Sequence, residues 1–164
     1  MLKRRILSSD VCFPTKLEII DIANSLEALR KKYIVVTNAH NQYLAHKSKE
    51  YLKVHEDAYL CLSDSQILNI SCFFLYGEKA NEVFLGSTIM KIICQNISKN
   101  IRVGLYGSSS TTLSELCKNL KILNPDINIK YSVSPPFREL AESEAAETVN
   151  QINERKLDIL FVGL

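Results

Sequence analysis

The sequence lacks the long apolar run and the charge excess that would assign it to a membrane or to nucleic acid. Its most apolar stretch, residues 67–76, is far shorter than the roughly 20 residues of a membrane-spanning helix. The basic N-terminus is not followed by the apolar segment of a signal peptide. The formal net charge is only +2, so nucleic acid is not expected as a partner. Any contact with a membrane is therefore expected to be peripheral.

The five cysteines lack the spacing of a redox or metal site. They are odd in number, widely spaced and set among apolar residues, and no Cys-x-x-Cys occurs. This pattern predicts reduced core residues in a cytoplasmic protein. They are Cys12, Cys61, Cys72, Cys94 and Cys117.

Metal-binding and hydrolase motifs are missing as well. His40, His46 and His55 are spaced by six and nine residues, which does not place them on one helical face, and no carboxylate cluster joins them. Solvated or capping histidines are therefore predicted. The sequence has no Asp-x-Asp pair for a divalent ion, and no G-x-S-x-G elbow surrounds the serines at 108–110. No metal and no cofactor are expected.

The apolar pattern that is present predicts an α/β domain. A length of 164 residues with 46% hydrophobic and 23% charged residues suits one globular domain. Strands alternating with helices imply right-handed βαβ units and a mostly parallel sheet. The predicted strands are 5–8, 33–36, 58–62, 101–106, 127–133 and 157–163. The predicted helices are 16–31, 40–47, 67–75, 88–98, 113–123 and 144–155, the last capped by Ser143, and a further turn is predicted at 48–54.

Three of these elements carry specific signals. Thr15 and Glu18 have capping-box spacing at the start of the helix at 16–31. The continuous apolar run at 33–36 is typical of a strand buried on both faces. The segment at 67–75 is expected to be a core helix. Two alternatives are left open for this segment. Residues 67–75 could form a strand, or residues 67–76 could form a helix that docks on a membrane surface.

Polar residues follow two of the predicted buried strands. Thr37 and Asn38 come after the strand at 33–36, and Asp64 comes after the strand at 58–62. Ligands of parallel α/β sheets bind just beyond the carboxyl ends of the strands. A carboxylate at that place can deprotonate an attacking hydroxyl. The alternative is that Asp64 only caps the following helix.

A turn rich in small residues follows the strand at 101–106. Gly104, Gly107 and the serines at 108–110 can place backbone N–H groups and a helix N-terminus against a diphosphate. The turn is not G-x-G-x-x-G, and it has no lysine in a P-loop position. A purely structural strand-to-helix turn is the alternative.

Several motifs occur in an order that resembles the WecG/TagA/CpsF glycosyltransferase family. Residues 35–47 resemble its T-x-N-A-x-x-x-Y-L-A-x-K stretch, and Leu62-Ser-Asp64 resembles its P-D-G. Residues 85–90 are similar to R-V-x-G-S-D-L-M, 103–107 to a strand ending in L-G-G, 131–137 to a segment with S-P-P-F, and 158–164 to the last core strand.

The resemblance implies a Rossmann-like, mostly parallel sheet with helices on both faces. It also implies a cytoplasmic enzyme at the inner membrane surface, active in cell-surface polysaccharide synthesis. Such an enzyme transfers a hexosyl or N-acetylhexosaminyl group from a UDP-sugar to a lipid-diphosphate-linked sugar, with inversion and without a metal or cofactor. The resemblance makes Asp64 the general base. The expected substrate-binding residues are Thr37, Asn38, Gly86, Ser87, Gly107, Ser108, Pro136 and Phe137.

The sequence also departs from the family pattern. Thr37 directly precedes Asn38, Ser65 replaces a glycine, and Val83 and Thr88 stand where Arg and Asp are usual. A P-K-Q-E motif and a C-terminal segment would follow residue 164. Residues 1–164 are thus expected to be a single domain lacking that segment, with impaired activity. A non-catalytic nucleotide-sugar-binding or scaffold protein is the main alternative, and a flavodoxin-like or receiver module is a weaker one. Homo-oligomer formation is left open.

Overall fold

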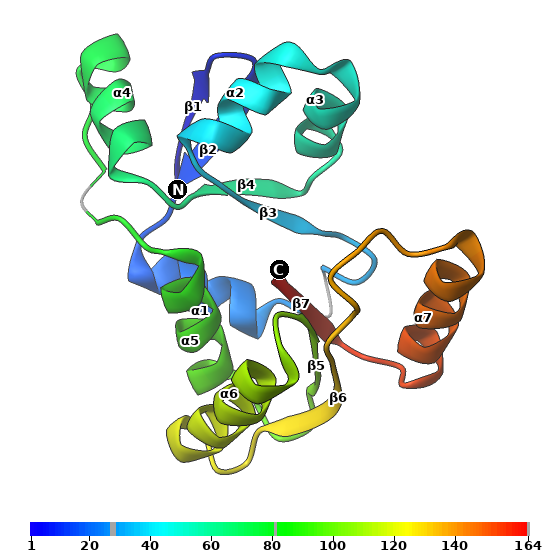
Figure 1. Cartoon of the computed structure of the whole chain (residues 1–164). Coiled ribbons are helices and arrows are strands. Elements are labelled where there is room, and N and C mark those ends of the chain that lie inside the picture. The colour runs from blue at the N-terminus through cyan, green and yellow to red at the C-terminus, as the bar shows by residue number, and fades with distance from the viewer. Residues whose placement is uncertain (27–28, 81, 164) are drawn as a thin grey trace. The chain divides into compact units, whose positions relative to one another are not determined.

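The computed structural model describes residues 1–26, 29–80 and 82–163 (Figure 1). The chain contains two compact units, Met1–Ile93 and Cys94–Leu164, and each unit builds its own sheet. Most strand pairs are parallel, and helices flank the strands, which confirms the predicted α/β class. The single domain expected for residues 1–164 stays a prediction.

The sheet of the first unit has the strand order β1-β2-β4-β3. An antiparallel hairpin forms one side of it, and the other pairs, β2 with β4 and β4 with β3, are parallel. The predicted strand at 5–8 is wrong because the hairpin turn falls inside it, with Leu7 at a φ of 56°. The strands are β1 (Leu2–Ile6), β2 (Ser9–Phe13), β3 (Ile34–Thr37) and β4 (Leu60–Ser63).

The strand β3 is less buried than its sequence predicts. Among the strands that the structure describes, it lies at an edge of its sheet, next to β4. Ile34, Val35 and Val36 are only half-buried. An edge strand lacks a neighbouring strand on one side, so fewer side chains cover its apolar residues. The expectation of burial on both faces is therefore wrong for β3.

The helices of the first unit follow the predicted pattern with shifted ends. Thr15 and Glu18 form the predicted capping box of α1, but the helix ends at Asn24 and not at residue 31. Residues 27 and 28 of the predicted helix lie outside the described residues. Asn and Ser are poor helix formers, which suits an end at Asn24 with Ser25 as the C-cap. The helices are α1 (Lys16–Asn24), α2 (Ala39–Lys47), α3 (Lys49–Glu56), α4 (Gln66–Tyr76) and α5 (Gly86–Asn96), which continues into the second unit.

The segment at 67–75 is a helix, as predicted, but it is not a core helix. Its inner residues Leu68 and Cys72 join a buried cluster with hairpin residues. Phe74 on the outer side is 80% exposed. The helix packs against β1 at the edge of the sheet (Figure 1), so the hairpin covers only one of its sides. The core assignment is therefore wrong for most of this helix.

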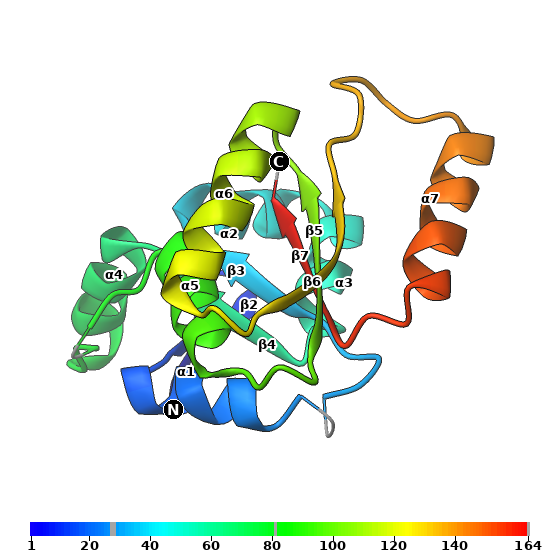
Figure 2. The same cartoon turned by 90° about the horizontal axis from the view of Figure 1, so that it is seen from below.

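The second unit is a three-stranded parallel sheet of order β6-β5-β7. Val103 and Leu105 of the central strand lie in its buried core. Figure 2 shows α6 on one side of these strands and α7 on the other, and α7 has no buried residue. The elements are β5 (Arg102–Gly107), α6 (Ser110–Leu123), β6 (Asn128–Val133), α7 (Glu142–Glu154) and β7 (Ile159–Gly163). The predicted strands of this unit are confirmed.

The cysteines are free thiols, as predicted. Four of them are buried, and Cys117 is half-buried. Burial raises the pKa of Cys61 and of Cys94 to about 11, so both stay protonated at neutral pH. Among the helices of the described ranges, none is both long enough and apolar enough to cross a bilayer.

Candidate functional site

The parallel pairing of β3 and β4 brings the first group of predicted site residues to one sheet edge. Thr37 lies opposite Ser63 in the register, so the residues after the two strands emerge together. The backbone N–H of Asp64 donates a 2.8 Å hydrogen bond to the carbonyl oxygen of Thr37. The backbone at the base of the site is therefore fixed by the sheet.

The carboxylate of Asp64 is held by the first turn of α5. Its Oδ1 accepts a 3.2 Å hydrogen bond from the backbone N–H of Gly86, which begins that helix. A Cβ at Gly86 would stand 3.3 Å from Val36 Cγ1 and 3.7 Å from Asp64 Oδ2. The tighter of the two contacts is with Val36, so the absence of a side chain at Gly86 leaves room for Val36 beside the first turn of α5. Ser87 follows Gly86 and is exposed within the first turn of α5. A helix that started at residue 88, as predicted, would have Ser87 as its N-cap, but the helix starts at Gly86.

Asp64 is not the cap of the helix that follows it. The N-cap of α4 is Ser65, whose hydroxyl accepts a 3.1 Å hydrogen bond from the N–H of Ile67. The capping alternative for Asp64 at α4 is therefore wrong. The Oδ2 atom of this half-buried carboxylate has no hydrogen-bond partner among the residues that the structure describes. One oxygen is held, and the other is available for a reacting group.

Asn38 lies beside Asp64 at the same edge and caps α2. Its Oδ1 accepts a 3.0 Å hydrogen bond from the N–H of Asn41, and the residue is exposed. The capping bond uses the carbonyl oxygen, which leaves the amide NH₂ as the group that a ligand would meet.

Thr37 is buried, unlike the exposed Asn38 that follows it. Its side chain is fully buried, and its hydroxyl accepts a 3.2 Å hydrogen bond from Gln42 Nε2. The hydroxyl therefore lies in the interior of the unit. The predicted contact between Thr37 and substrate stays a prediction. The structure shows that the carbonyl oxygen of Thr37 accepts the hydrogen bond from Asp64 N–H.

A buried polar network behind Thr37 is absent from the sequence-based prediction. Ser9 Oγ donates to Gln42 Oε1 at 2.9 Å and lies 3.1 Å from His55 Nδ1. His55 is only 4% exposed, so its assignment as a solvated or capping histidine is wrong. Burial lowers the pKa of His55. The one sequence signal for the network is that Gln42 shares the inward face of α2 with Ala45.

The second group of predicted site residues lies in the second unit, at the carboxyl end of β5. Gly107 has a φ of +129°, and a Cβ there would overlap the backbone oxygen of Gly163 at the end of β7. Only glycine fits this contact. Ser108, at a φ of 56°, accepts a 2.6 Å hydrogen bond on its carbonyl oxygen from Ser134 Oγ. The loop is thereby tied to the end of β6.

The N-terminus of α6 follows directly from this loop. Ser109 caps the helix by accepting a 3.1 Å hydrogen bond from the N–H of Thr112, so α6 starts three residues before its predicted start. The segment after β6 carries the remaining predicted residues, Pro136 and Phe137, both exposed. The N–H of Arg138 donates to the carbonyl of Pro136 at 2.8 Å and closes a turn. Their contact with substrate stays a prediction.

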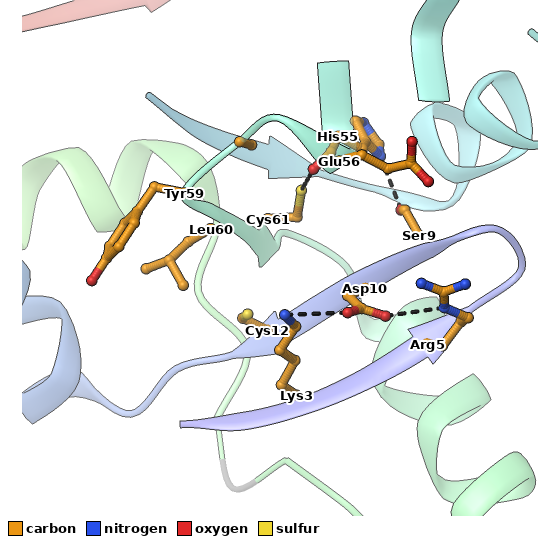
Figure 3. A pocket seen from close by; sticks show the side chains of 11 residues that line it. Lys3, Arg5, Ser9, Asp10, Cys12, His55, Glu56, Tyr59, Leu60 and Cys61 are labelled. Atoms are coloured by element: carbon orange, nitrogen blue, oxygen red, sulfur yellow. Dashed lines mark hydrogen bonds and ion pairs between the residues drawn. The ribbon is translucent and has the colours of Figure 1, made fainter. Parts of the chain in front are cut away.

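A separate pocket of about 300 Å³ lies at the opposite end of β4 (Figure 3). Its lining includes Leu60 and Cys61, which begin the strand, whereas Asp64 follows its end. Lys3 and Arg5 both contact Asp10 in this pocket, at 3.2 and 3.1 Å. Hydrogen bonds from Arg5 and Lys3 lower the pKa of Asp10. The cations of the pocket therefore already have an anionic partner.

No three His, Cys, Asp or Glu side chains of the described ranges lie close enough together to hold a metal ion.

Known proteins resemble this chain over most of its length. The model of the Glycosyl transferase WecG/TagA/CpsF family matches residues 6–164. A curated protein of Shigella boydii, UDP-Gal:alpha-D-GlcNAc-diphosphoundecaprenol beta-1,4-galactosyltransferase, is 27% identical over 125 residues. The aligned region covers 76% of this chain and 52% of the relative, so the chain spans about half the length of that protein.

Proposed function

The chain belongs to the WecG/TagA/CpsF family of glycosyl transferases, and on this premise we propose that it transfers a sugar from a UDP-sugar to a lipid-diphosphate-linked sugar. The transferred group would be a hexosyl or N-acetylhexosaminyl unit, used in cell-surface polysaccharide synthesis. The name of the Shigella boydii relative, which pairs a UDP-sugar with a diphosphoundecaprenol-linked sugar, supports both substrate classes. The protein would act in the cytoplasm, peripheral to the membrane that holds the acceptor.

Asp64 serves as the general base in this proposal. The acceptor hydroxyl gives its proton to Asp64 Oδ2 as its oxygen attacks the anomeric carbon of the donor. The bond from that carbon to the diphosphate breaks, UDP leaves with the bonding electrons, and attack from the opposite face inverts the configuration. The observation that carries the proposal is the carboxylate itself. It lies beyond parallel strands, with Oδ1 bound to Gly86 N–H and Oδ2 without a partner among the described residues.

Asn38, Gly86 and Ser87 would contact the donor in the first unit. Thr37 would act mainly through its carbonyl bond to Asp64. Asn38 supplies an exposed amide, and α5 begins at Gly86 beside the carboxylate.

In the second unit, Gly107, Ser108, Pro136 and Phe137 would line the donor side. The N-terminus of the 14-residue helix α6 follows this loop. Backbone N–H groups there would meet the charge that develops on the leaving diphosphate, without a metal ion. The family resemblance and the tie between Ser108 and Ser134 support this assignment.

The test combines ligand binding with turnover. We expect UDP to raise the melting temperature of the chain, because a ligand that binds only the folded state stabilises it. ADP at the same concentration is the control nucleotide. We also expect UDP release from a UDP-sugar when a lipid-diphosphate-linked sugar is added. A UDP-dependent rise without any glycosyl product would favour the non-catalytic alternative. No change in melting temperature with UDP or any UDP-sugar would contradict the proposal.

A further inference from the structure

The helix α4 presents an apolar face that its own unit does not cover. The face consists of Ile67, Ile70, Phe73 and Phe74, which are 61%, 52%, 50% and 80% exposed. Ile67, Ile70 and Phe74 recur at spacings of three and four, so they form one stripe along the helix. The rings of Phe73 and Phe74 contact each other edge to face, with centroids 5.9 Å apart. We call these four residues the α4 apolar face.

The opposite side of α4 already has its packing partners. Leu68 and Cys72 lie in the buried cluster with Ile6, Val11 and Phe13 of the hairpin. Tyr76 at the end of the helix donates a 2.7 Å hydrogen bond to the carbonyl of Arg5. The helix is therefore fixed on the hairpin by its inner side, which leaves the α4 apolar face pointing away from it.

The charges around α4 favour an anionic surface. The helix itself, Gln66–Tyr76, contains no charged residue. Arg4 lies over the ring of Tyr76 at 5.7 Å and binds Glu78 at 2.6 Å, and the exposed Lys79 follows the helix. Lys3 and Arg5, on the same strand as Arg4, point to the other face of the sheet, where they share the carboxylate of Asp10. Two cations, Arg4 and Lys79, and the carboxylate of Glu78 thus adjoin an uncharged apolar helix.

The size of the face argues against a second copy of the chain as its occupant. A helix of 11 residues is roughly 16 Å long and about 10 Å wide, so one face offers at most a few hundred Å². Stable protein interfaces bury about 800 Å² on each partner. Insertion of isoleucine and phenylalanine side chains among lipids requires no such area, and anionic headgroups attract neighbouring Lys and Arg.

We propose that the α4 apolar face docks the protein on the headgroup region of an anionic membrane. This inference rests on the proposed function, in which the acceptor is held by a membrane lipid. The helix begins at Gln66, two residues after Asp64, so docking would keep the general base within about one helix length, roughly 16 Å, of the lipid surface. The diphosphate of a lipid-linked acceptor lies at that level.

A single tryptophan reports the insertion directly, because the chain contains none. In the full chain, the emission of Phe74→Trp is expected to shift to the blue when vesicles of phosphatidylcholine and phosphatidylglycerol in equal parts are added. Ile122→Trp is the matched control, since Ile122 is 79% exposed on α6. Its emission should not change. An equal shift in both variants, or none in Phe74→Trp, would overturn the proposal.

Loss of the face should weaken vesicle binding without unfolding the chain. We expect Ile70→Ser/Phe74→Ser to reduce sedimentation with the same vesicles by about tenfold or more, since each exposed side chain adds apolar contact with lipid. Ile122→Ser should sediment like the unchanged protein, and melting temperatures should agree for all three. Unchanged sedimentation of the double variant would overturn the proposal. So would light scattering that shows a dimer of the unchanged chain lost in the double variant, since the occupant would then be a second copy.

The rise in melting temperature with UDP separates this proposal from the proposed function. The double variant should keep the rise, because its substitutions lie outside the donor site. If the chain binds vesicles but its melting temperature does not change with UDP, the proposed function is contradicted and the docking surface is supported. If UDP raises the melting temperature but the chain does not bind vesicles, the docking surface is contradicted and the proposed function is supported.

Discussion

The carboxylate of Asp64 and the backbone N–H of Gly86 are joined by a 3.2 Å hydrogen bond across 22 residues of sequence. This contact links the end of β4 to the start of α5. It orients the carboxylate through one oxygen, and it depends on a glycine because Val36 Cγ1 leaves little room for a Cβ. The site is thus built from two polar segments, after β3 and after β4, and from one helix start.

Gly86→Ala should impair turnover more than stability. The new Cβ would stand 3.3 Å from Val36 Cγ1, so the Val36 side chain or the first turn of α5 must give by a few tenths of an ångström. We expect part of this shift to fall on α5 and to loosen its bond to Asp64. We expect turnover to fall by roughly tenfold or more, because small displacements of catalytic groups are costly. Alanine also favours the helix by about 0.5–1 kcal/mol, which should offset the strain. Turnover of a UDP-sugar equal to that of the unchanged chain, at equal melting temperature, would show that the approach of α5 does not matter.

Thr37→Val should lower the stability of the fold. The substitution keeps the shape of the side chain but removes the hydroxyl that accepts from Gln42 Nε2, in a fully buried place. An unsatisfied buried donor costs about 1–3 kcal/mol in the free energy of unfolding. Urea denaturation measures this change.

Thr37→Ser is the matched control for that prediction, since it keeps the hydroxyl. It should restore most of the hydrogen-bond contribution and lose only the packing of one methyl group. If Thr37→Val were as stable as the unchanged chain but inactive, while Thr37→Ser stayed active, the hydroxyl would act on substrate and not in the interior.

His55 should make the chain less stable as the pH falls. Burial lowers the pKa of His55 in the folded state below its ordinary value of about 6.5 in the unfolded chain. The unfolded state therefore binds the proton more readily, and the stabilising contribution is present above that value and lost as the pH falls below it. We expect the free energy of unfolding to decline between about pH 7.5 and about pH 5.5.

Comparison of His46→Gln with His55→Gln tests whether His55 causes this decline in stability. His46 is exposed, with Nδ1 2.9 Å from Ser8 Oγ, so its replacement should leave the pH dependence in place. His55→Gln should flatten the curve over the same range, whatever its absolute stability. If the decline in stability persists in His55→Gln, titratable groups other than His55 cause it.

The parts of the fold that follow from local pattern were predictable. Apolar runs located β3, β4 and the strands of the second unit, and parallel strand ends placed Asn38 and Asp64 at one edge. The hairpin was missed because β1 contains the cationic residues Lys3, Arg4 and Arg5 and so lacks the apolar run by which the other strands were predicted. Charged side chains are typical of edge strands, and the turn at Leu7 has neither Gly nor Asn to mark it.

Other features depend on tertiary packing that a sequence does not carry. The apolar pattern of α4 is the same whether a second layer covers Phe74 or not, so its exposure could not be read from residues. The contact of Ser9 with His55 joins residues 46 apart. Likewise, Asp64 next to Ser65 has the pattern of a cap, and only the geometry shows that Ser65 takes that role.

The most direct test of the account is the turnover of Asp64→Asn with a UDP-sugar and a lipid-diphosphate-linked sugar. Asparagine can still accept from Gly86 N–H but cannot take the acceptor proton. We predict a loss of roughly 10²–10⁴-fold in turnover, with the rise in melting temperature on adding UDP retained. Asp126→Asn, an exposed acid in the turn before β6, should behave like the unchanged chain. Unchanged turnover in Asp64→Asn would contradict the assignment of Asp64 as the general base.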